Sequence, residues 1–262
     1  TTTTSTTVSD SSVYTSGYCY SGGKTVKISK LVKALQTGSF SSSTHAAQVL
    51  QDCWTAIHDN EGRQLELGQD HADGVPSIIR LMDRFPEDPT VQYLACSILR
   101  DLTATHQLNR QIIVDKHDGL RVLLLALLRH EHSMLVQVAA MGALAHITLY
   151  PPAVRIPDGP FHRLCGMDVL KTCLEAYPHH APLQIQASRV LAAVASSPAG
   201  ARALGSQGLV SHVAQAVIDT HHDHQDHLDQ QHLDEWRYQA CRAIEALCHE
   251  TPLNRDQCAI AV

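Results

Sequence analysis

An alanine recurs at the head of the same apolar pattern in five places along this chain. Apolar residues follow each alanine at three, four and seven positions, a spacing that puts the four side chains on one face of a helix. In the clearest case Ala95 is followed by Ile98, Leu99 and Leu102. The pattern therefore predicts long, half-buried helices built around Ala46, Ala95, Ala140, Ala187 and Ala240.

The alanine frames follow one another at intervals of 45 to 53 residues. A period in this range is typical of one supersecondary unit stacked on copies of itself. In such an array each unit contacts its neighbours, and the surface offers a groove rather than an enclosed active site. The sequence therefore predicts an all-α repeat protein, with no sheet.

Each unit reads as three helices separated by a glycine break and a loop. The second unit shows this best, because a short helix opens at Asn109 and ends at Gly119. An apolar helix over 120–128 and a longer helix through Ala140 follow. Gly74, Gly166 and Gly208 are expected to mark the same break in the other units, where a helix must stop and turn.

An asparagine lies 14 residues after the alanine in three of the five units, as Asn60, Asn109 and Asn254. Asparagine is among the preferred N-cap residues, because its side-chain oxygen accepts a free N–H group of the first helical turn. We therefore expect these asparagines to cap the short first helix of the next unit. Val154 and Ala201 hold the same position in the other two units.

The order of short helix, glycine break, apolar helix, loop and long helix resembles the armadillo repeat, best over 74–102 and 119–147. The resemblance covers residues 25–262, as about five repeats and the start of a sixth. It implies a right-handed α-solenoid whose third helices line a concave groove. HEAT repeats are the near alternative, but they lack the short first helix and the glycine break. Residues 1–24 are rich in Ser and Thr and are expected to form an extended tail.

In importin-α and β-catenin relatives, an Asn six residues after the alanine holds the backbone of an extended peptide. Importin-α adds a Trp two residues after the alanine. This chain has neither series, because the +6 positions include Asp101, His146 and Ala193, and the +2 positions include Ser97 and Gly142. Recognition of nuclear localisation signals is therefore disfavoured.

The helical phase nevertheless defines a stripe on the third helices that lies opposite the core-facing alanine. The stripe runs from an acidic end at Asp101, past the small apolar Val138 and Gly142, to a basic end at Arg242. A protein ligand is then expected to place its basic end toward the N-terminal repeats. The predicted protein-binding residues are Tyr93, Ser97, Asp101, His146, Arg189, Tyr238 and Arg242. A solvated face with no ligand is the alternative interpretation.

Charge and composition limit the kinds of partner. The formal net charge of −6 argues against a nucleic-acid footprint. The 8 cysteines are scattered without a CxxC pair, which favours a reducing compartment and a cytoplasmic location. No apolar stretch approaches the roughly 20 residues that span a bilayer.

Two clusters could carry chemistry, and neither has the spacing that it needs. His and Asp alternate from His221 to Asp234, and both residue types ligate metals, but the run has no Cys partner and no fixed framework. We interpret it as a polar loop, and a metal-binding module is the alternative. Cys165 lies near His162, but no third group orients the imidazole for nucleophilic catalysis. No P-loop or GxSxG motif occurs, so no catalytic residue, metal or cofactor is predicted.

The sequence therefore predicts a non-catalytic scaffold that binds a protein partner in its groove or along its N-terminal tail. A larger intracellular assembly, such as a cytoskeletal or ciliary complex, is the expected setting. The alternative is a regulatory or docking segment of a larger signalling enzyme, such as a kinase or ubiquitin ligase. That alternative stays open because the chain stops at Val262, within an expected helix.

Overall fold

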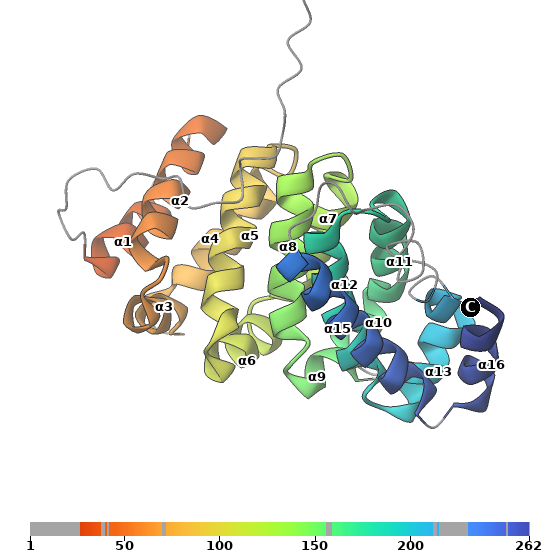
Figure 1. Ribbon diagram of the computed structural model, residues 1–262. Helices are drawn as coiled ribbons and strands as arrows, with labels where there is room; N and C mark the ends of the chain where they lie inside the picture. The colour runs from red at the N-terminus through yellow and green to blue at the C-terminus, as the bar shows by residue number, and fades with distance from the viewer. Residues whose placement is uncertain are drawn as a thin grey trace, which may run out of the picture.

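The protein is all-helical in the part of the chain that the computed structural model describes (Figure 1). That part consists of residues 27–37, 40, 42–69, 72–155, 159–211, 214, 230–249 and 251–261, and none of them is in a β-strand. The tail expected over 1–24 and the His-rich run 221–229 lie outside it. The run was expected to stay a loop as far as Asp234, but a helix begins at Gln230.

The helices follow the order of the predicted units. An opening pair is formed by α1 (Ile28–Thr37) and α2 (Ser43–Ile57). Two complete sets of three follow: α3 (Glu61–Gly68), α4 (Gly74–Arg84) and α5 (Pro89–Ala104), then α6 (Gln107–Asp115), α7 (Gly119–Arg129) and α8 (Met134–Ile147).

The next unit differs in its first helix, which is replaced by two short helices, α9 (Pro151–Val154) and α10 (Pro160–Arg163). They precede α11 (Gly166–Ala176) and α12 (Ala181–Ala195). Next come α13 (Pro198–Ser206), α15 (Gln230–Cys248) and α16 (Pro252–Ala261).

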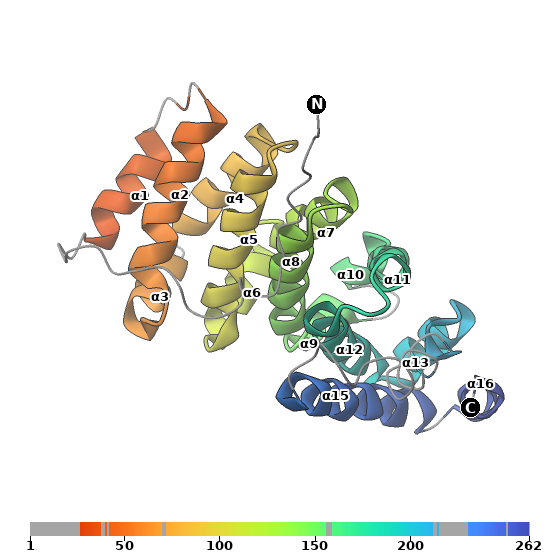
Figure 2. The same ribbon diagram turned by 45° about the horizontal axis from the view of Figure 1, so that its top comes forward.

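The long helices α2, α5, α8, α12 and α15 pack against one another in chain order, as Figure 2 shows. Their alanines Ala46, Ala95, Ala140, Ala187 and Ala240 are all 0% exposed, which confirms the predicted frame. The frame is less closely packed at the two ends of the row, where Val49 and Ile244 are only half-buried.

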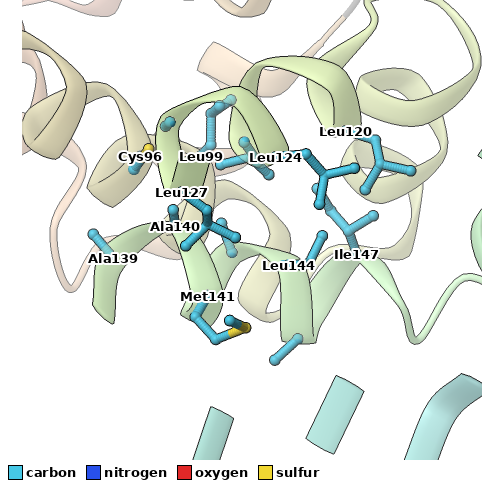
Figure 3. Packing of buried hydrophobic residues seen from close by; sticks show 14 of the residues in the cluster. Cys96, Leu99, Leu120, Leu124, Leu127, Ala139, Ala140, Met141, Leu144 and Ile147 are labelled. Atoms are coloured by element: carbon cyan, nitrogen blue, oxygen red, sulfur yellow. The ribbon is translucent and has the colours of Figure 1, made fainter. Parts of the chain in front are cut away.

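The centre of the row has an aliphatic core, shown in Figure 3. Leu99 of α5 and Leu144 of α8 are fully buried, and Leu124 and Leu127 of α7 lie in the same cluster. Cys96 belongs to this core, and burial raises the pKa of its thiol to about 12. Cys96 therefore acts as a small apolar side chain.

At each glycine break two adjacent positions have different roles, one steric and one conformational, which the sequence analysis did not distinguish. Gly74 begins α4, and a Cβ there would lie 2.5 Å from the Leu67 carbonyl oxygen, so glycine is needed for space. The residue before the glycine is the left-handed one, with φ of 55°, 53° and 55° at Asp73, Asp118 and Cys165. Gly208, with φ 75°, holds that preceding position, so its predicted alignment with Gly74 was wrong by one residue.

The N-cap prediction is right for Asn60 and wrong for Asn109 and Asn254. The Asn60 side chain accepts a hydrogen bond from the Arg63 N–H at 3.1 Å. The other two asparagines lie inside α6 and α16 and are 0% and 1% exposed. These two helices begin two residues before their asparagine, at Gln107 and Pro252.

The two buried asparagines each tie their own unit to the one before it. Asn109 Nδ2 donates to the Leu102 carbonyl at 2.8 Å and to the Gln64 carbonyl at 3.4 Å. Asn254 Nδ2 makes the equivalent bonds to the carbonyls of Leu247 and Ala201, at 2.8 and 2.9 Å. Each amide therefore satisfies one free carbonyl at the end of a long helix and one carbonyl of the preceding first helix.

Glycine in the preceding unit leaves room for each of these asparagines. A Cβ on Gly68 would clash with the Asn109 side chain, and one on Gly205 would clash with Asn254. The arginine that follows each asparagine completes the helix end. Arg110, for example, donates to the carbonyls of Thr103 and Ala104, both at 2.7 Å. A guanidinium there also faces the negative end of the helix dipole.

A buried glutamine closes the second helix of each central unit, and the sequence analysis missed it. Gln92 Nε2 donates to the carbonyls of Met82 and Phe85, at 2.9 and 3.0 Å. The same two bonds recur at Gln137 and Gln184. The signal was available, because a glutamine lies three residues before Ala95, Ala140 and Ala187.

A search of the described residues for a membrane-spanning helix found none with the necessary length and apolar character.

Candidate protein-binding face

The seven predicted binding residues lie on α5, α8, α12 and α15, and they differ sharply in exposure. Ser97 and Asp101 are buried, contrary to the prediction that the stripe faces away from the core. Tyr93, His146 and Arg189 are half-buried, whereas Tyr238 and Arg242 are exposed. We call the five accessible ones, together with Val138 and Gln186, the long-helix face.

Asp101 is a structural residue that connects α2 to α5. One carboxylate oxygen accepts hydrogen bonds from Trp54 Nε1 and His58 Nδ1, both at 2.9 Å. The other accepts from Arg100 Nε and Nη2, both at 3.1 Å. These four hydrogen bonds occupy the acceptor sites of the Asp101 carboxylate, and the residue is only 9% exposed. The predicted acidic end of the stripe is therefore wrong.

Trp54 and His58 explain why the prediction failed. Both belong to the C-terminal end of α2 and its cap, and they reach across to the +6 position of the next long helix. A helical phase calculation on α5 alone contains no information about side chains on α2. Trp54 also contacts Tyr93 edge-on, with ring centroids 5.9 Å apart.

Ser97 lies too deep to contact a partner. It is 0% exposed, and its hydroxyl oxygen has no hydrogen-bond partner in the described part of the chain. The predicted small apolar centre is also partly covered. A Cβ on Gly142 would lie 3.0 Å from Arg100 Cδ, so the aliphatic part of Arg100 lies over this glycine.

His146 is set in a positive environment on α8. Its Nδ1 donates to the Arg100 carbonyl at 3.2 Å. Burial lowers the pKa of His146, and the nearby charges of Arg110, Arg100 and Arg189 lower it further, against the effect of that hydrogen bond. The neutral imidazole is therefore favoured, and His146 contributes a hydrogen-bonding edge to the long-helix face, not a charge.

Arg189 joins α12 to α15 through an ion pair. Its Nη2 lies 2.6 Å from Glu235 Oε1. The hydrogen bond from Gln239 to Glu235, and then the Arg189 contact, lower the pKa of that carboxyl group. Arg189, like Arg100, therefore already has a carboxylate partner within the protein.

Tyr238 and Arg242 form the most open part of the long-helix face. Tyr238 is 59% exposed. The guanidinium carbon of Arg242 lies 5.9 Å from the Tyr238 ring centroid, which is cation–π distance. No carboxylate of the described residues lies within ion-pair distance of Arg242.

The catalytic and metal-binding clusters considered from the sequence do not form in the described part of the chain. Cys165 is exposed, and its contact with His162 is a backbone hydrogen bond from N–H to carbonyl at 3.1 Å. A search of the described residues for groups of three metal-ligating side chains found none.

A scan of the chain against protein-family models found no match, and neither did searches of curated proteins and of solved structures.

Proposed function

We propose that this chain is a non-catalytic protein-binding scaffold, built as a right-handed, armadillo-like α-solenoid. The observation that supports the proposal is the packing of α2, α5, α8, α12 and α15 in chain order, each with its alanine fully buried. Helices that stack this way present one continuous surface made of one side chain or two from each unit.

The composition of that surface suits protein recognition. The long-helix face combines the aromatic rings of Tyr93 and Tyr238 with the guanidinium groups of Arg189 and Arg242. Tyr and Arg are enriched among residues that dominate binding energy, because they offer large contact area with a polar end. Val138 adds a half-buried apolar position between them.

The proposed setting is intracellular. The described cysteines are free thiols, among them the exposed Cys165 and Cys241. Exposed free thiols persist in the reducing cytoplasm, whereas oxidising compartments favour disulfides.

Affinity capture from the native cell, followed by mass spectrometry, tests the proposal. Two variants place a lysine on the long-helix face, Val138→Lys on α8 and Gln186→Lys on α12, and both are expected to lose the captured partner. Thr172→Lys on the exposed surface of α11 is the matched control and should retain it. Thermal melts verify that each variant is folded. Equal recovery by all three folded variants would contradict the proposal.

A further inference from the structure

A cleft of about 480 Å³ opens where α12 ends, α13 begins and the C-terminal half of α15 passes. Ligand pockets commonly have volumes of 300–1,000 Å³. Small side chains make up much of the walls, including Ala192 and Ala195 of α12, Ala201 of α13 and Ala246 of α15, and His249, just after α15, also lines the cleft. Short side chains allow the backbone of a ligand to approach the helices closely.

The cleft occupies the place that a polar network fills between α2 and α5. Trp54 lies eight residues after its alanine, and Asp101 lies six residues after the next one. At the same offsets in the α12–α15 pair stand Ala195 and Ala246. Replacement of an indole and a carboxylate by two methyl groups therefore leaves this junction open.

The cleft is lined by one cation and one anion, Arg242 and Glu245, and Arg242 is the group that can receive an anionic ligand. Arg100 and Arg189 each have a carboxylate partner, Asp101 and Glu235 respectively. Arg242 lines the cleft, and its guanidinium group contacts the Tyr238 ring. An exposed guanidinium of this kind can bind a carboxylate through two parallel hydrogen bonds.

Glu245 determines on which side the ligand carboxylate lies. It lines the cleft one helical turn after Arg242, and the two side chains form no ion pair. A ligand carboxylate at Glu245 would be repelled, so we expect it on the opposite side of Arg242, toward Tyr238, which lies at the edge of the cleft and not among its lining residues. The exposed Tyr238 ring then provides contact area next to it.

The short side chains of the walls favour an extended ligand over a helical one. A helix with its side chains is about 10–12 Å across, which keeps its backbone away from the walls. An extended segment is narrower and can follow the alanine walls.

We propose that this cleft binds an extended segment of a partner protein that carries an acidic residue among small ones, with its carboxylate on Arg242. The inference rests on the proposed scaffold function and names the chemistry of its ligand.

NMR spectroscopy of the protein labelled with [¹³C-methyl]alanine tests the proposal directly. The probes are three pools of ten-residue peptides with Gly, Ala and Ser flanks. They differ only at two central positions, which are acidic, amide or basic. The acidic pool should shift the methyl signals of Ala192 and Ala246 saturably and leave the core alanines Ala95 and Ala140 unchanged. The amide pool should bind at least tenfold more weakly.

Variants assign the effect to Arg242. Arg242→Glu should lose the response to the acidic pool and gain one to the basic pool, whereas Arg242→Lys should keep the acidic preference. Arg202→Glu, the same charge reversal at an exposed site on α13 outside the cleft, is the control and should behave as wild type. Equal shifts from the three pools, no shift from the acidic pool, or an unchanged response in Arg242→Glu would overturn the proposal.

The two proposals can fail separately. If Val138→Lys and Gln186→Lys abolish partner capture while the acidic pool leaves the cleft alanines unchanged, the scaffold function stands and only the cleft assignment falls. If capture is indifferent to the long-helix face, the scaffold proposal itself fails.

Discussion

The junction between α2 and α5 and the junction between α12 and α15 have the same architecture and opposite character. At the first, Asp101 is buried and accepts hydrogen bonds from Trp54, His58 and Arg100. At the second, Arg242 is exposed beside an alanine-lined cleft. Equal helical phase therefore does not mean equal exposure, because the side chains of the preceding long helix decide whether a position is covered.

Charge reversal should give the largest difference in stability between the two junctions. Asp101→Arg leaves three donor side chains without their acceptor and places a second cation beside Arg100, so we expect a loss of about 3–5 kcal/mol in the free energy of unfolding. Arg242→Glu should change it by less than about 0.5 kcal/mol, because its side chain is exposed. Urea denaturation measures both, and similar losses from the two variants would refute the contrast.

Core truncation should show the same difference in packing. Leu99→Ala and Leu144→Ala should each cost about 2–5 kcal/mol, the range for cavities at buried leucines. Ile244 holds the equivalent frame position on α15 but is only half-buried, so Ile244→Ala should cost less. Calorimetric melts give the comparison. A loss below about 0.5 kcal/mol at both leucines would show that they are not core residues.

The asparagine ties provide a smaller effect. Asn109→Val copies the residue that the chain itself uses at position 154. The substitution leaves the carbonyls of Leu102 and Gln64 without their donor in a buried place, which should cost about 1–3 kcal/mol. Amide hydrogen exchange should rise first in α3 and α6, where the tie is anchored. Unchanged exchange there would mean that water replaces the amide.

Acid should weaken the α12–α15 junction slightly. The lowered pKa of Glu235 means that its contribution is fully present above the unfolded value of about 4.3 and is lost as pH falls through the folded value. Because both partners are partly exposed, the contribution should stay below about 1 kcal/mol. Glu235→Gln should therefore be less stable than wild type at pH 7 and equal to it near pH 2. A constant difference across that range would contradict the assignment.

Periodicity within one helix was enough to predict the helical units and the buried alanines, since Ala95 and its counterparts need only their own helix to define a face. The role of Asn109 could not be predicted this way. An asparagine just before a helix and one inside its first turn look alike in sequence, and its partners come from another unit. Asp101 failed for a similar reason, because the donors that bury it lie 43 and 47 residues earlier.

The matched pairs of glycine and asparagine, Gly68 with Asn109 and Gly205 with Asn254, make the order of the units specific. Asn109 and Asn254 each need a glycine in the first helix of the preceding unit. In the unit that precedes Val154, Ile113 holds the position of that glycine. A rearranged chain that placed an asparagine-bearing unit after Ile113 would force a branched side chain against a buried amide. The units of this protein are therefore not interchangeable modules. Any shuffled or extended version must keep each asparagine-bearing unit directly after a unit that has the matching glycine.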